Sequence, residues 1–267
     1  MTQPLDDDQE HAGDPAPAYD REAEVRRVLA SDESLMGRIY CYERDKLTPQ
    51  QIADAEGNQT PAFVYNYRLQ INSIVHGEVP DSAWVARGVA AKLRRWLRVV
   101  ELSPDLRRDL QKLESTARSR ADDPDAEADL LKEAVTKTVE AEQKAGAGIY
   151  VYTLPHYLKH PIDPASGKTL LKVGHSARDA HYRAGSQGRL TALPEDPLLL
   201  RIYPAQESSK TEREFHAWLR DADHVAGRTR RAGSEWFVTS VKFLDRIAGS
   251  LNLEVIEVNQ FDTSDDA

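Results

Sequence analysis

The chain has 267 residues, which is long for one domain and sufficient for two. Its formal net charge is −9 at pH 7, and its one cysteine, Cys41, excludes an intrachain disulfide and a cysteine-based zinc site. No apolar run approaches the about 18 residues that cross a bilayer, and no basic-then-apolar leader opens the chain. We therefore expect a cytoplasmic protein without a membrane partner.

The negative charge is concentrated in the two tails. Residues 1–20 carry six acidic residues and no Lys or Arg, whereas residues 146–250 carry 15 Lys and Arg against 11 Asp and Glu. We expect residues 1–20 to form a disordered acidic tail and residues 259–267 to form a second acidic tail. The segment between them contains a mildly basic region, which is compatible with a nucleic-acid partner.

Residues 21–145 have helical apolar periodicity and predict a helical domain that binds DNA or another partner. Within it, Thr48-Pro49 and Thr60-Pro61 each combine a capping residue with a proline at the first helical position. Gly57 can end the first helix in a left-handed conformation, and the second helix is expected to stop at His76-Gly77. Two short helices with such a turn are typical of a helix-turn-helix, although an ordinary helical hairpin is the alternative.

In a helix-turn-helix, the second helix enters the major groove of double-stranded DNA. Its outward residues near the start would then contact bases and phosphates: Thr60, Ala62, Tyr65, Asn66 and Arg68.

Three more helices are expected before the second domain. The first spans residues 82–100 and begins at the cap Ser82, and the second runs from Ser103 to about Arg120. The third is a charged, Ala-rich connector over residues 126–145. Dimerisation through this connector would make the chain an interaction protein, so a homodimer is left open.

Residues 146–258 alternate between strand and helix patterns and predict a second domain. Two apolar runs, Gly148–Leu154 and Leu170–Ser176, flank a turn-rich connection and favour an antiparallel hairpin. The remaining elements are strands at 198–203, 235–238 and 253–258, and helices at 177–184, 241–251 and from Ser208 or Ser209 to Asp221. A small antiparallel sheet with flanking helices follows, so the fold class is α+β.

The hairpin resembles the GIY-YIG nuclease family. The first tripeptide, Gly148-Ile149-Tyr150, is intact, and the second is Lys172-Val173-Gly174, as in a phage-associated subgroup of the family. Three later features resemble this subgroup in type and order: Arg183, the Glu212-x-x-Phe215-His216 run, and Glu235-Trp236-Phe237. The resemblance does not extend to the first 145 residues.

This resemblance implies a divalent-metal-dependent DNA endonuclease that hydrolyses phosphodiester bonds with a single Mg²⁺ or Mn²⁺ ion. Tyr150 would accept the proton of the attacking water, Arg183 would hold the scissile phosphate, and Glu212 would bind the metal. Arg178 and Arg189 are rivals for the arginine role, and Glu214 is a rival for the metal. Restriction or phage defence is a setting suggested by association alone.

Lys172 has a role that follows from its charge. A phenol with a pKa of about 10 is a poor base at neutral pH unless a cation lowers that pKa. Lys172 lies on the strand facing Tyr150 and could supply this cation, which would make it a catalytic residue.

Other side chains complete the predicted site. His216 lies one helical turn after Glu212, on the same face of the helix. We expect it to form a hydrogen bond or to contact phosphate, and packing alone is the alternative. The triplet Glu235-Trp236-Phe237 is expected in the core, with Trp236 and Phe237 as large hydrophobic anchors. Residues expected to contact DNA around the cleft are His175, Arg178, Arg189, Arg228, Arg230 and Arg231. The runner-up function is a non-catalytic helix-turn-helix regulator that keeps the nuclease fold as a scaffold.

Overall fold

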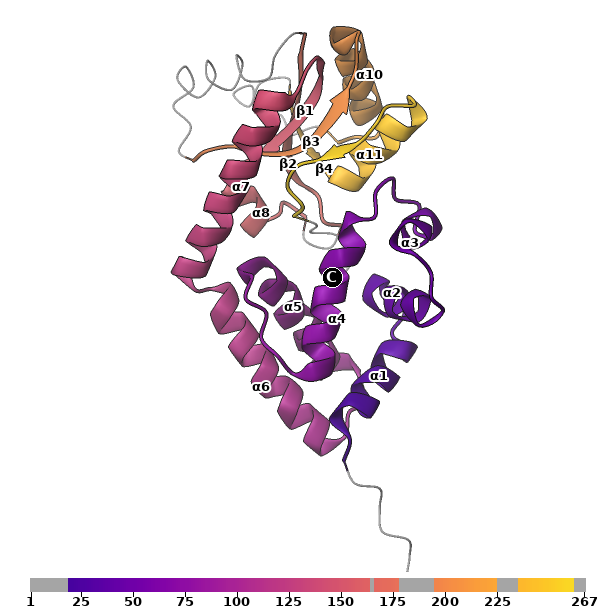
Figure 1. Ribbon diagram of the computed structural model, residues 1–267, viewed down its shortest axis with the longest axis vertical. Helices are drawn as coiled ribbons and strands as arrows, with labels where there is room; N and C mark the ends of the chain where they lie inside the picture. Colours follow the sequence, from indigo (N-terminus) through magenta and orange to yellow (C-terminus); the bar gives the residue numbers. More distant parts are fainter. Residues whose placement is uncertain (1–18, 164–165, 178–194, 225–234, 262–267) are drawn as a thin grey trace, which may run out of the picture.

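The structure is a computed structural model that describes residues 19–163, 166–177, 195–224 and 235–261. In these ranges the chain forms a helical part followed by a part built on an antiparallel sheet, which confirms the α+β class (Figure 1). The predicted tail at 1–20 lies almost entirely outside the described residues. No helix in the described ranges is both long and apolar enough to cross a bilayer.

The helical part contains seven of the described helices, and the last of them leads to the sheet (Figure 1). Ser82 and Ser103 cap two of these helices through their hydroxyls, as predicted. Inside the bundle the fully buried Lys92 ammonium lies 2.8 Å from the Asp32 carboxylate. The bounds are α1 Arg21–Ser31, α2 Leu35–Arg44, α3 Pro49–Ala55, α4 Ala62–His76, α5 Ala83–Val99, α6 Pro104–Ala121 and α7 Pro124–Lys144.

Helices α3 and α4 reproduce the predicted helical pair with one correction. Thr48 and Gln51 form a reciprocal capping box at the start of α3. Gly57 has the predicted positive φ, 66°, and Gly77, where α4 ends as predicted, also has a positive φ of 76°. Thr60 does not cap α4. The N-cap position is Pro61, and the Thr60 hydroxyl instead donates a hydrogen bond to Glu257 of the sheet part.

The second part is a five-stranded sheet in the order β4-β2-β1-β3-β5, with every pair antiparallel. The predicted hairpin is confirmed, and its connection contains a short helix, α8, that begins at Pro155. The strands are β1 Gly148–Thr153, β2 Thr169–Ser176, β3 Leu198–Pro204, β4 Trp236–Thr239 and β5 Ile256–Glu257, and the helices are α8 Pro155–Lys159, α10 Ser208–Asp221 and α11 Val241–Ser250. The helix expected at 177–184 lies almost entirely outside the described residues.

Alternation along β1 gives the sheet two buried faces. Ile149 and Val151 belong to a core that also contains Phe215 of α10 and Leu244 of α11. Tyr150 lies in a second cluster, which includes Ala141 of α7. Helix α7 is therefore more than a connector, because its Ala141 packs against the Tyr150 cluster and its Ala134 belongs to the core shared with α10 and α11. Figure 1 shows α7 on the side of the sheet away from α10 and α11.

The C-terminal segment Asn259–Phe261 belongs to the fold, so the expected boundary at residue 258 is too early. The buried Asn259 amide donates to the carbonyls of Ala134 and Leu199, at 3.1 and 2.9 Å, and to the Thr138 hydroxyl at 3.0 Å. One side chain thus joins α7 to β3. Residues 262–267 lie outside the described residues.

Replacing Asn259 with alanine should lower the free energy of unfolding by about 2 kcal/mol, because two buried carbonyls lose a donor. Urea denaturation followed by circular dichroism measures this change. The matched control is Asn72→Ala on the exposed side of α4, which should change stability by less than about 0.5 kcal/mol. Equal effects of the two substitutions would show that Asn259 does not join α7 to the sheet.

His224 follows α10 and is buried against α11 and β4. Its Nδ1 lies 2.9 Å from the Thr239 hydroxyl, and its ring meets the Phe243 ring edge-on at 4.4 Å. Burial, with a smaller contribution from the Lys168 charge, lowers the pKa of His224 below its ordinary value of 6.5. The folded state therefore favours the neutral imidazole.

This lowered pKa makes stability depend on pH in a defined direction. The unfolded chain protonates His224 first as pH falls, so the His224 contribution to stability is complete above pH 6.5 and is lost as pH falls toward the folded-state pKa. Urea midpoints at pH 7.5 and pH 5 should differ more for the wild type than for His224→Asn, which keeps a polar atom near Thr239 but does not titrate. An identical pH dependence in both proteins would contradict the prediction.

Candidate active site

The pairing of β1 with β2 places Gly174 directly opposite Tyr150. Tyr150 is buried, with 3% of its surface exposed, and its hydroxyl donates a hydrogen bond to the Gly146 carbonyl. The phenol proton is therefore engaged with the backbone at the start of β1. To act as a base, this hydroxyl would first have to leave the carbonyl.

Glu212 reaches the same place from α10. Its Oε1 lies 3.9 Å from the position that a Cβ atom on Gly174 would occupy. This oxygen is buried and has no hydrogen-bond partner among the described residues. The other oxygen, Oε2, lies 3.6 Å from Nε2 of His175, whose Nδ1 lies 3.2 Å from the Ser208 hydroxyl. A buried carboxylate oxygen without a donor is costly unless a cation or another donor compensates it.

A second carboxylate, from Glu235, lies beside Glu212. Its Oε2 is 3.6 Å from the same Cβ position on Gly174 and 3.3 Å from the Lys172 ammonium. The sequence predicts the triplet that begins with Glu235 in the core, and this is confirmed for Phe237, which is buried, whereas Trp236 is only partly buried. Glu235 was missed because its place depends on the pairing of Trp236 with Lys172, a register that the sequence does not reveal.

His216 is fixed inside the fold. Nε2 of the buried ring donates to the Val173 carbonyl at 2.8 Å, and the ring lies 4.8 Å from the Phe237 ring. Because its acceptor is a carbonyl, this nitrogen must carry the proton. His216 thus holds α10 against β2 through a hydrogen bond and ring packing, which fits both the predicted hydrogen-bonding role and the packing alternative; a contact with phosphate stays a prediction.

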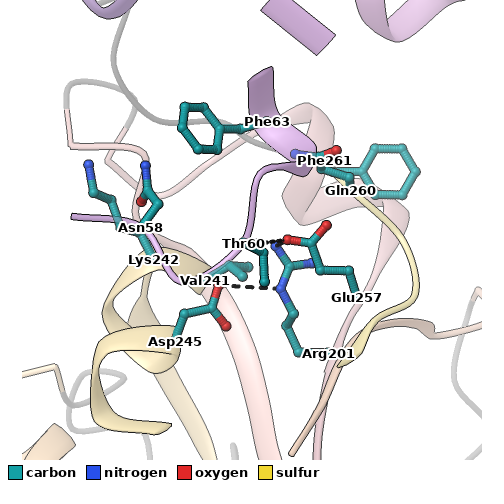
Figure 2. Close-up of a pocket in the computed structure, with 10 residues that line it drawn as sticks. All are labelled: Asn58, Thr60, Phe63, Arg201, Val241, Lys242, Asp245, Glu257, Gln260 and Phe261. Carbon is teal, nitrogen blue, oxygen red and sulfur yellow. Dashed lines mark hydrogen bonds and ion pairs between the residues drawn. The ribbon is translucent and has the colours of Figure 1, made fainter. Parts of the chain in front are cut away.

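The N-terminal end of α4 contacts the sheet part of the protein. Figure 2 shows Thr60 and Phe63 lining a small pocket with Arg201 of β3, Asp245 of α11 and Glu257 of β5. The Thr60 hydroxyl points to the Glu257 carboxylate, to which it donates a hydrogen bond.

Arg201 neutralises the acidic side of that pocket. This buried guanidinium lies 3.4 Å from Asp245 and 3.3 Å from Glu257. Asp245 also accepts a hydrogen bond from the Tyr203 hydroxyl at 2.7 Å. Burial, followed by the nearby Asp245 charge, raises the pKa of Tyr203 well above its ordinary value. This network is a structural contact between β3, α11 and α4.

The other predicted DNA contacts on α4 lie farther along the helix. Tyr65 is 53% exposed, and the Arg68 guanidinium lies 5.3 Å from its ring centre while pairing with Glu43. Tyr65 and Asn66 line a cavity of about 270 Å³ between α4, α7 and the C-terminal segment. Of this set, Tyr65 is the most accessible, and Thr60 is occupied by the sheet part.

Several predicted residues cannot be placed. The following lie outside the described residues: Arg178, Arg183, Arg189, Arg228, Arg230 and Arg231. Within the described ranges, no group of three or more His, Cys, Asp or Glu side chains is arranged to hold a metal ion. An ion bound to Glu212 would therefore be held by fewer than three such side chains, and other ligands would have to complete its coordination shell.

Comparisons of the chain with family models, with curated proteins and with solved structures find no match. Function must therefore be inferred from the chain's own residues.

The Thr60–Glu257 hydrogen bond predicts a measurable coupling between α4 and β5. Thr60→Val should lower the free energy of unfolding by about 1.5 kcal/mol, because the acceptor is charged. In a Glu257→Ala background the same substitution should cost clearly less. Thr116→Val, on the exposed side of α6, is the control and should have little effect. Strict additivity of the two changes in urea denaturation would contradict the coupling.

Proposed function

We propose that the protein is a DNA endonuclease of the GIY-YIG type that hydrolyses phosphodiester bonds with one divalent ion, Mg²⁺ or Mn²⁺. The observation that carries this proposal is the buried Oε1 of Glu212, which has no hydrogen-bond partner among the described residues and lies beside Gly174, opposite Tyr150. A carboxylate oxygen left in this state beside Gly174, the residue paired with Tyr150, is suited to a cation.

The residues present fit such an ion. Mg²⁺ prefers oxygen ligands and is commonly held by one or two carboxylates together with waters and substrate oxygens, so a larger protein cage is not required. Glu212 would hold the ion through Oε1, while His175 lies close to the other oxygen. When bound, the ion would stabilise negative charge on the phosphate and the leaving oxygen.

The protein groups supply the remaining tasks. Tyr150 would move from the Gly146 carbonyl to accept the proton of the attacking water. For this, the phenol must first lose its own proton to solvent, and the Lys172 ammonium would stabilise that phenolate if it moved from Glu235. The phenolate becomes a phenol again when it takes the proton of the water. Arg183, placed by the resemblance alone, would hold the scissile phosphate through paired N–H donors.

Double-stranded DNA is the proposed substrate, and a cytoplasmic role in restriction or phage defence is the proposed setting. The basic excess of residues 146–250 supports an electrostatic attraction to phosphates. The alternative of a helix-turn-helix regulator is less well supported. The start of α4, the helix that would enter the major groove, contacts the sheet part of the protein. The dimerising-connector alternative is also weakened, because Leu130, Leu131 and Val135 of α7 pack against the chain's own core.

The proposal predicts that Glu212→Gln abolishes Mg²⁺- or Mn²⁺-dependent cleavage. We expect a rate loss of about 100-fold or more, because a metal ion contributes several kcal/mol to such a transition state. Conversion of supercoiled plasmid to nicked and linear forms on agarose gels measures the rate, and circular dichroism checks the fold.

The matched control for this experiment is Glu214→Gln, two residues farther along α10. It tests the rival metal ligand directly and should retain wild-type cleavage. If Glu214→Gln lost cleavage while Glu212→Gln retained it, the metal ligand would be Glu214 and not Glu212. Absence of cleavage by the wild-type protein on unmodified and modified DNA, with either metal, would contradict the proposed function.

A further inference from the structure

We infer that Glu235 is a second carboxylate ligand of the divalent ion at Glu212, and that Lys172 competes with this ion for Glu235. The inference rests on the proposed function only for the presence of the ion. Beyond that function, we assign to the chain a metal site made of two carboxylates from different elements. The Lys172 ammonium competes with the metal ion at this site.

The geometry around Gly174 supports two ligands. The position of a Cβ atom on this glycine would lie 3.6 Å from Glu235 Oε2 and 3.9 Å from Glu212 Oε1. Glycine leaves this position empty, so the two carboxylates border a common space. One arrives from the residue before β4 and the other from α10, on two separate stretches of the chain.

The charges around that space point to a cation. Only 15% of the Glu212 side chain and 37% of the Glu235 side chain are exposed, so water screens their mutual repulsion incompletely. Lys172, whose side chain is 21% exposed, contributes one positive charge, at 3.3 Å from Glu235. The Glu212 oxygen that faces Gly174 has no donor among the described residues. A divalent ion would compensate both carboxylates at once.

Lys172 is therefore a counter-ion that the divalent ion must displace from Glu235. Removing its charge should leave Glu235 available and strengthen cation binding. Removing the Glu235 charge should weaken binding, because affinity for a hard divalent cation depends on the number of charged oxygen ligands.

The test uses the full-length protein and Mn²⁺ alone, with free Mn²⁺ measured by electron paramagnetic resonance. Wild-type protein should bind one ion. Glu235→Gln and Glu212→Gln should each weaken binding by about tenfold or more. Glu254→Gln, which removes an exposed carboxylate in the same part of the chain, is the control and should bind as the wild type does.

Two further variants separate ligation from general damage. In Gly174→Ala, the added methyl group would make only ordinary van der Waals contacts, so the protein should fold normally while the methyl group occupies the space between the carboxylates. It should lose Mn²⁺ binding by about tenfold or more. Lys172→Met keeps the length of the side chain and should bind Mn²⁺ more tightly. Circular dichroism and thermal unfolding confirm the fold of each variant.

The outcomes distinguish this inference from the proposed function. Mn²⁺ binding by Glu235→Gln at wild-type affinity, with loss in Glu212→Gln, would overturn the second ligand and leave the endonuclease intact. If Mn²⁺ binding required both carboxylates but the protein did not cleave DNA, the second ligand would be supported and the proposed endonuclease function would be contradicted. A wild-type protein that binds no Mn²⁺ would overturn both.

Discussion

The register between β1 and β2 is the constraint on which the site depends. Side chains alternate between the two faces of a strand, so a slip of one residue would move Tyr150 to the face now occupied by Ile149 and Val151. Those two residues are fully buried against α10 and α11, whereas Tyr150 belongs to the cluster covered by α7. The hydrophobic contacts on both faces thus hold Gly174 opposite Tyr150, and a site made of polar groups is positioned by apolar packing.

Apolar packing of helix α10 against the sheet also positions Glu212 beside Gly174. Phe215 and Leu219 are fully buried, and the Phe215 ring stacks on Tyr203 of β3 at 5.2 Å. His216 adds a directional contact, because its hydrogen bond to the Val173 carbonyl joins α10 to the residue before Gly174. Glu212 lies about one turn from Phe215 and His216. A side chain supported by a docked helix holds its position more closely than one on a loop.

Local signals in the sequence were sufficient for most of the elements but not for every contact. Ser82, Ser103 and the Thr48 capping box mark helix starts because a cap depends only on neighbouring residues, and the hairpin is marked by two apolar runs around a turn-rich connection. Thr60 and Glu235 could not be placed in this way. Their partners are Glu257 and Lys172, distant in the sequence. Local signals favour a helix cap for Thr60 and a place in the core for the triplet that contains Glu235. The roles implied for Tyr150 and Glu212 stay predictions, although the structure brings both residues to Gly174.

The contact between the two parts changes how the helical part would meet DNA. Thr60 donates to Glu257 and Phe63 lines the same pocket, so these two residues at the start of α4 are occupied by the sheet part. The accessible portion of the predicted reading surface is then Tyr65, beside the cavity that Asn66 shares with α7. Helix α7 packs against α5 and also covers the sheet, so it links this surface to the strand that carries Tyr150. If the proposed duplex substrate contacted Tyr65, packed helices would position it relative to Gly174, and the helical part would then orient the substrate without reading bases.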